Sequence, residues 1–145
     1  HHALAAWPAW PEYAELVGGQ FLYKPGLVRG SPCPDSGYRH EVSHTLTVET
    51  DHPVTRGLPK QFSLTDEVYS AQEAVQGRLY SRQGWQHSEG THLGAWVRRQ
   101  GNSPIVYLQC GDGPETYADP NFRRLLANAI AWVSSEEARE WARSD

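Results

Sequence analysis

Residues 119–133 carry the pattern that most constrains the fold of this chain. Asp119 is a good helix cap, and Pro120 suits the first position of a helix. We therefore predict a long amphipathic helix here, followed over residues 136–141 by a helical tail or a second short turn. The apolar residues recur at intervals of three and one, and form one wide stripe to be buried: Phe122, Leu125, Leu126, Ala129, Ile130 and Val133.

Shorter segments upstream have the patterns of β-strands. Residues 40–48 alternate so that His40 and His44 share the apolar face. A short helix is predicted at residues 8–16 and a surface loop at residues 25–37. Further strands are predicted at residues 20–23, 67–71, 78–82, 93–99 and 104–109, and the last two should pair through a hairpin-like turn.

Composition narrows the class of protein and its partners. With 145 residues, 39% of them hydrophobic, the chain is long enough for one domain, and we place no boundary within residues 1–145. The formal charge is −4 and no Lys/Arg cluster is interleaved with aromatics, so no nucleic-acid partner is expected. No apolar run approaches the roughly 20 residues of a membrane span, so no membrane partner is expected. Cys33 and Cys110 neither require nor exclude a disulfide bond, which leaves secretion open beside a favoured cytoplasmic location.

Candidate functional residues gather in the turn-rich segment 51–69, because loops held by a rigid scaffold often carry chemistry. His52, before Pro53, either caps the following turn or acts in a site. Glu67, at the start of a predicted strand, could be a general base or a ligand. Asp66 and Glu67 are neighbours on that strand, so their side chains should point to opposite faces unless a bulge intervenes.

Histidine and carboxylate side chains also suit a divalent metal such as zinc, although their spacing does not establish a site. His40 and His44 would be separated by roughly 13 Å along a strand, too far for one ion. We expect His44 to be a buried core residue, whereas either role is open to His40. No nucleotide is expected, because the weak glycine pattern around Asp112 is not followed at once by a helix and its carboxylate would repel phosphate.

Aromatic side chains beside polar groups are suited to sugar stacking. We expect most of them in the core, including Trp10 and Tyr13 on the first helix stripe and Trp132 near the last one. Tyr117, in a loop after a predicted strand, is the aromatic residue we expect to face a ligand. The remaining aromatics of this set are Trp7, Trp85 and Trp96.

Several short blocks of sequence follow one another in a characteristic order: residues 1–3, 10–13, 17–19, 52–53, 57–59, 66–69, 106–111 and 121–132. Their order resembles that of the trehalose-utilization (ThuA-like) family, whose fold is similar to that of class I glutamine amidotransferases. The resemblance implies a doubly wound, flavodoxin-like α/β sandwich. It also implies that an N-terminal strand–helix portion is missing, so that residues 1–145 are an incomplete C-terminal portion or a partner chain supplies the rest.

Departures from the superfamily argue against glutamine amidotransferase activity. That reaction needs a cysteine on a sharp turn and a histidine beside it. His1 and His2 stand where the turn would fall, and Asp112 follows Gly111 where the family has histidine. Cys110 is more simply explained as a small buried hydrophobe than as a nucleophile.

The resemblance and the residues together suggest a protein of trehalose or keto-sugar utilization that performs acid–base chemistry on a sugar derivative, with or without a metal. The alternative is a non-catalytic sugar- or protein-binding module, and a homo-oligomer is compatible with either hypothesis. We assign catalytic roles to His2, His52 and Glu67. The expected substrate-binding residues are His1, His40, Tyr69, Asp112 and Tyr117.

Overall fold

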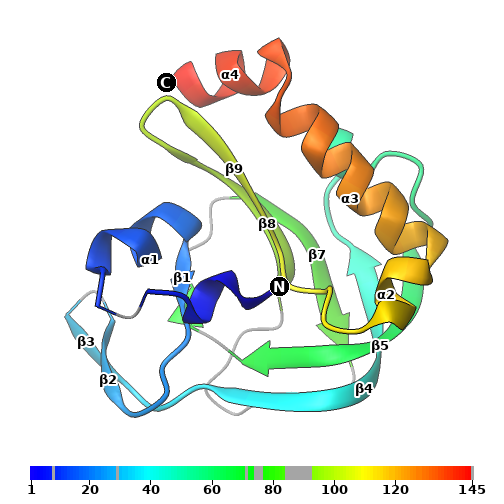
Figure 1. The fold of residues 1–145 in the computed structure, drawn as a ribbon. Coiled ribbons are helices and arrows are strands. Elements are labelled where there is room, and N and C mark those ends of the chain that lie inside the picture. The colour runs from blue at the N-terminus through cyan, green and yellow to red at the C-terminus, as the bar shows by residue number, and fades with distance from the viewer. Residues whose placement is uncertain (8, 29, 71, 74–76, 84–92, 145) are drawn as a thin grey trace.

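The structure is a computed structural model that describes residues 1–7, 9–28, 30–70, 72–73, 77–83 and 93–144. Figure 1 shows a curved sheet with the C-terminal helices (yellow to red) along one side and the N-terminal helical segment (blue) on the other. In chain order the elements are η1 (His2–Ala5), α1 (Pro11–Val17), β1 (Gly19–Gln20), β2 (Gly26–Val28), β3 (Ser31–Cys33), β4 (Gly37–Val48), η2 (Pro53–Thr55), β5 (Gln61–Ser70), β6 (Gln72–Glu73), β7 (Gly77–Gln83), β8 (Leu93–Gln100), β9 (Ser103–Leu108), α2 (Pro114–Ala118), α3 (Pro120–Val133) and α4 (Glu136–Arg143).

Five of the described strands form one sheet in the order β5-β4-β7-β8-β9, and each neighbouring pair is antiparallel. The predicted pairing of residues 93–99 with 104–109 is confirmed, because β8 and β9 form a hairpin that closes at Gln100 and Ser103. A mixed α/β fold is therefore confirmed. The doubly wound sandwich is not confirmed, because such a sheet is mostly parallel.

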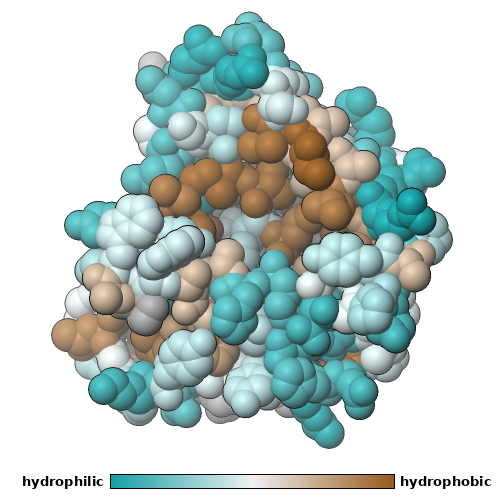
Figure 2. Space-filling view, viewed as in Figure 1, coloured by the Kyte–Doolittle hydropathy of each residue, from teal (hydrophilic) through white to brown (hydrophobic). Residues whose placement is uncertain are grey.

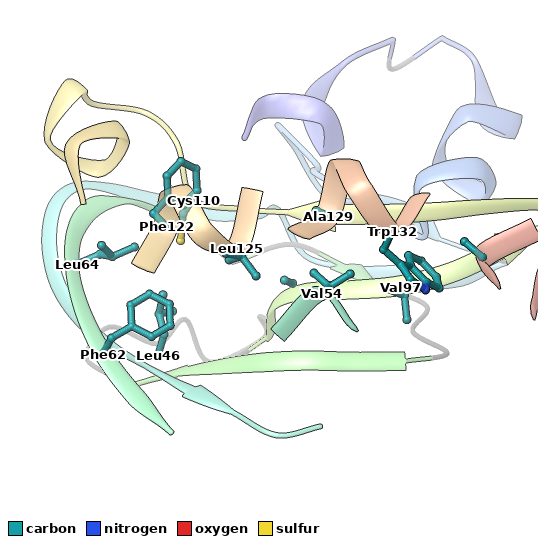
Figure 3. Close-up of a cluster of buried hydrophobic side chains, with 12 residues drawn as sticks. Leu46, Val54, Phe62, Leu64, Val97, Cys110, Phe122, Leu125, Ala129 and Trp132 are labelled. Carbon is teal, nitrogen blue, oxygen red and sulfur yellow. The ribbon is translucent and has the colours of Figure 1, made fainter. Parts of the chain in front are cut away.

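The main core lies between α3 and the sheet. The helix predicted after Asp119 is confirmed, and the Asp119 carboxylate accepts the first backbone N–H groups of α3. The stripe differs from the prediction at Ile130, which is 61% exposed because only one side of α3 rests on the sheet. Trp132 is buried, as expected. Figure 3 shows this core, which includes Leu46, Val54, Phe62, Leu64, Val97, Cys110, Phe122, Leu125, Ala129 and Trp132.

A second core packs the N-terminal segment against the sheet. Leu4 and Phe21 are buried here, and the Phe21 N–H donates to the Leu4 carbonyl at 2.8 Å. Trp96 of β8 stacks on Tyr107 of β9 in the same cluster, and Tyr69 of β5 joins it. Because Leu4 is anchored in this way, the two histidines that precede it lie beside the ends of β5 and β9.

Several local predictions need correction. Residues 20–23 are a strand only at Gln20, and the predicted loop at 25–37 contains the β2–β3 hairpin. Trp10 is 47% exposed and Tyr13 is half-buried, so the aromatic side of α1 is not a buried stripe. Predictions for residues 8, 71 and 85 lie outside the described residues. None of the described helices is long and apolar enough to cross a membrane.

Candidate functional site

Glu67 of β5 is the centre of a cluster of histidines and tyrosines. Its carboxylate is buried, with 6% of the side chain exposed. One oxygen, Oε2, lies 2.8 Å from His1 Nε2 and accepts the hydroxyl of Tyr69 at 2.6 Å. The other, Oε1, lies 3.0 Å from His40 Nδ1. Three donors from three parts of the chain thus converge on one carboxylate.

A β-bulge in β4 aims His40 at Glu67. Arg39 pairs with Val68 and Val42 with Asp66, so two residues of β4 oppose the single Glu67. Glu41, the second of these two residues, takes a positive φ of 53°. The bulge breaks the alternation that the sequence predicts, and for this reason His40 is 64% exposed while His44 is 3% exposed.

The N-terminal histidines join the cluster beside the end of β9. His1 Nδ1 lies 2.6 Å from the backbone carbonyl of Gln109, directly after β9, and Tyr107 donates to the His1 carbonyl at 3.2 Å. His2 Nδ1 lies 2.8 Å from the Tyr69 hydroxyl. Since that hydroxyl donates to Glu67, His2 is the donor to Tyr69, and the three groups form a hydrogen-bonded chain.

The contacts of the two ring nitrogens of His1 determine how many protons its hydrogen bonds require. Both of its ring nitrogens face oxygen acceptors, the Gln109 carbonyl at Nδ1 and the Glu67 carboxylate at Nε2. A neutral imidazole carries one N–H and cannot satisfy both acceptors. Donation to both acceptors would need the imidazolium form, or a cation at Nε2, which also lies 3.0 Å from the Tyr69 hydroxyl.

The surroundings hold Glu67 in its ionised form. Burial acts to raise the pKa of Glu67, but hydrogen bonds from Tyr69 and His1 and the charges of His40 and His1 outweigh it, so this pKa lies below its usual value. Burial and the hydrogen bond to Glu67 raise the pKa of Tyr69 far above its usual value. At neutral pH the site therefore combines a carboxylate with a protonated phenol.

Asp66 anchors the loop after β9 that carries Asp112 to the edge of the site. Its carboxylate accepts the backbone N–H of Gly111 at 2.7 Å and of Asp112 at 3.0 Å, and also the N–H of Glu67 at 2.9 Å. Asp66 and Glu67 make different contacts, as strand parity predicts. The loop carries Asp112, whose Oδ1 lies 3.7 Å from His1 Nε2.

His1, Glu67 and Asp112 form the group of potential metal ligands found among the described residues. One ligand atom from each lies within 4.8 Å of the others. Imidazole and carboxylate are ligands that zinc and similar ions use. The Gln109 carbonyl at His1 Nδ1 resembles the hydrogen-bond partner that commonly orients a ligating histidine.

Two residues that the sequence analysis assigned to the site lie outside this cluster. His52 caps η2, where its Nδ1 accepts the N–H of Val54, and its ring packs edge-on against Trp132 at 4.6 Å between centroids. It is kept from the cluster because η2 packs against α3. Tyr117, on α2, is 51% exposed and contacts Phe122 edge-on at 5.3 Å between centroids.

The remaining assigned residues come together: His1, His2, His40, Glu67 and Tyr69 form the cluster, and Asp112 lies at its edge. Cys110 is buried in the main core, and neither cysteine forms a disulfide bond. Sequence reasoning missed Gln109, which supplies its carbonyl to His1 and accepts the Tyr69 N–H through its side chain at 3.3 Å. The available signal was a polar residue directly after the apolar run of β9.

Comparisons with known proteins agree on one family. The family model "Trehalose utilisation" (ThuA) matches residues 1–133. A ThuA-like protein from Parabacteroides merdae has a similar structure, with a TM-score of 0.75 and 19% identity over 93% of this chain and 58% of that one. A second, from Bacteroides uniformis, has a TM-score of 0.62 and 22% identity over 92% of this chain and 56% of that one. The chain thus spans less than two thirds of either protein, and no curated protein matches it.

Proposed function

The chain belongs to the trehalose-utilisation (ThuA) family, and from that premise we propose that its histidine–carboxylate cluster transfers protons on a sugar derivative. The proposed substrate is a keto-sugar, either free or derived from trehalose. The observation that carries the proposal is Glu67, a buried carboxylate that contacts two imidazoles and a phenol at 2.6–3.0 Å. Such shared contacts are typical of sites that move protons.

His40 is the proposed general base. Its Nδ1 faces a carboxylate oxygen, so in the neutral ring Nδ1 carries the proton and Nε2 keeps its lone pair. Glu67 then orients the ring and stabilises the imidazolium that forms, as a carboxylate does beside a catalytic histidine. His40 is 64% exposed, which leaves its ring accessible to a sugar from solvent.

His1 is the proposed acid. In the reaction, His40 Nε2 takes the proton from the carbon next to the sugar carbonyl, and the C–H electron pair forms a C=C bond. The carbonyl oxygen takes a proton from the His1 imidazolium, which gives an enediol. The reverse transfers, to the other carbon and from the other oxygen, complete an isomerisation and return both histidines to their first states.

The same donors suit a divalent cation, and we propose zinc or a similar ion as the alternative to the Nε2 proton of His1. The ligands would be His1, Glu67 and Asp112. Such an ion supplies Lewis acidity toward a carbonyl oxygen. Calorimetric titration of the tag-free protein with Zn²⁺ tests this: Asp112→Asn should weaken binding about tenfold or more, and equal affinity in wild type and variant would contradict the assignment.

Deuterium exchange tests the proton transfer. The protein is mixed with a keto-sugar in D₂O, and loss of the proton beside the carbonyl is followed by NMR. His40→Asn and Glu67→Gln should each slow exchange by about 100-fold or more. His52→Asn, which removes an imidazole outside the cluster, should leave the rate unchanged.

Two results would contradict the proposed reaction. Exchange at the wild-type rate in both cluster variants would remove the assignment to His40 and Glu67. No exchange in the wild type, together with measurable sugar binding, would instead favour the non-catalytic sugar-binding module.

For the fold, we propose that whole proteins of the family have the doubly wound, amidotransferase-like sandwich. Two observations support this: the structural relatives extend beyond the part that this chain matches, and β9 is an edge strand of the sheet formed by the described residues, although its sequence is apolar. A structure of a whole family member in which β9 has no further neighbouring strand would contradict it.

A further inference from the structure

The hydroxyl of Tyr69 lies at the centre of three short contacts. It donates to Glu67 Oε2 at 2.6 Å, and it lies 2.8 Å from His2 Nδ1 and 3.0 Å from His1 Nε2. Tyr69 is 4% exposed and the side chain of His1 is 11% exposed, whereas His2 is an exposed residue. The Tyr69 hydroxyl therefore connects an imidazole at the surface with one that is largely buried.

The direction of these hydrogen bonds sets the tautomer of His2. The Tyr69 hydroxyl has one proton, which it donates to Glu67. His2 Nδ1 is then the donor in the 2.8 Å contact with the Tyr69 oxygen. In the neutral ring of His2 the proton is therefore on Nδ1, and Nε2 keeps its lone pair. An exposed ring thus offers a proton acceptor beside the site.

The proposed isomerisation needs a second acceptor of this kind. His1 gives its proton to one oxygen of the sugar, but the proton that must come back is on the neighbouring oxygen. Both ring nitrogens of His1 are held by hydrogen bonds, so its ring is fixed beside the first oxygen. Two neighbouring sugar oxygens, each hydrogen-bonded to an imidazole, can bridge nitrogens about 6–8 Å apart. The ring centroids of His1 and His2 lie 6.4 Å apart, which suits such a bridge.

We propose that His2 is a further catalytic residue, and that the Tyr69 hydroxyl carries its proton back to His1. This inference rests on the proposed function, with a proton and not a cation at His1 Nε2. His2 Nε2 takes the proton from the second oxygen of the enediol, and the O–H electron pair forms the new carbonyl. The electron pair of the C=C bond takes the proton from His40.

Two linked transfers then restore His1. His2 Nδ1 gives its proton to the Tyr69 oxygen, and the Tyr69 proton passes to His1 Nε2, which has become an acceptor 3.0 Å away. Burial and the hydrogen bond to Glu67 raise the pKa of Tyr69, so its hydroxyl gives one proton only as it receives another. His2 is left with its proton on Nε2, and exchange with water at its exposed ring restores the first tautomer. We call this path the His2–Tyr69 relay.

The ratio of isomerisation to deuterium exchange tests the relay. One NMR experiment on fructose in D₂O gives both rates, because exchange can return the proton to the first oxygen whereas isomerisation uses the second. His2→Asn keeps an N–H donor for Tyr69 but removes Nε2, and should lower the ratio about tenfold or more. Tyr69→Phe should lower it to a similar extent. Tyr107→Phe removes a hydroxyl that donates to the His1 carbonyl outside the relay, and should keep the wild-type ratio.

The tautomer of His2 tests the relay without turnover. In protein with isotope-labelled histidines, the nitrogen NMR shifts of neutral His2 should place the proton on Nδ1. Tyr69→Phe removes the acceptor of that proton and should abolish the preference for Nδ1.

The outcomes separate this inference from the proposed reaction. A selective loss of isomerisation in His2→Asn and Tyr69→Phe supports the relay. Three results would overturn it and leave proton abstraction by His40 in place: a proton on Nε2 of neutral His2 in the wild type, equal losses of exchange and isomerisation in His2→Asn, or exchange without isomerisation in the wild type. Absence of exchange in the wild type would remove the proposed reaction itself, and the relay with it.

Discussion

Replacing Asp66 with asparagine tests whether this buried carboxylate holds the site together. Its Oδ1 accepts the N–H groups of Glu67 and Asp112, and its Oδ2 accepts that of Gly111. Asparagine keeps one oxygen, and its best orientation leaves the Gly111 N–H facing an NH₂ group. Losing one hydrogen bond to a charged acceptor costs about 1.5–3 kcal/mol, and the two that remain weaken by about 0.5 kcal/mol each. We expect Asp66→Asn to lower the free energy of unfolding by about 2.5–4 kcal/mol.

Urea unfolding followed by tryptophan fluorescence measures this loss. Asp119→Asn is the matched control, because Asp119 also accepts backbone N–H groups but does so at a helix N-terminus, where asparagine is equally favourable. Its free energy of unfolding should change by less than about 0.5 kcal/mol. If Asp66→Asn were no more destabilising than Asp119→Asn, the carboxylate would not be the anchor of the loop.

Three further changes have clear expected outcomes. Burial lowers the pKa of His52 below its ordinary 6.5, so the unfolded chain binds the proton more readily and the free energy of unfolding should fall as pH drops below about 6.5. His52→Asn keeps the cap and should reduce this pH dependence, measured by urea titrations at about pH 5 to 7. An unchanged pH dependence in the variant would refute the role of His52. Gly111 has a φ of 123°, and a methyl group added there would lie 3.0 Å from the Tyr117 hydroxyl. Gly111→Ala should therefore lower the free energy of unfolding, measured by thermal unfolding, by about 1–3 kcal/mol. The loss should exceed that of Gly101→Ala, where nothing lies close to an added methyl group. Asn128→Ala removes two hydrogen bonds to backbone carbonyls of the η2 region and should cost about 1–2 kcal/mol, whereas a loss below about 0.3 kcal/mol would show that the contact contributes little.

Local sequence patterns predicted the elements whose stability is local or whose partner is adjacent in sequence. α3 has its own cap and stripe, and β8 and β9 are joined by a short turn, so both were predictable. The strand order was not predictable, because β4 lies between β5 and β7 through contacts between distant segments. The bulge at Glu41 was also missed, since a positive φ at a glutamate has no signal in an alternating pattern.

The sequence predicted the types of residue in the site better than it predicted which individual residues come together there. Family resemblance placed His1, His2 and Glu67 among the candidates, and the structure brings these three to one place. His52 was equally plausible from sequence, because a histidine before proline can be either a cap or a ligand. Only tertiary packing decides between these roles, and η2 packs against α3 rather than against the ends of β5 and β9.

The unequal exposure of the two histidines on Glu67 supports the roles that we propose for them. His1 is 11% exposed and held at both ring nitrogens, so its ring is fixed. His40 is 64% exposed and is held by Glu67 at Nδ1. A residue that exchanges protons with a diffusing substrate needs one reachable nitrogen, and a residue that donates to a fixed position needs a rigid ring. Because one carboxylate serves both, removing its charge should disable acid and base together, whereas removing either imidazole should leave the other in place.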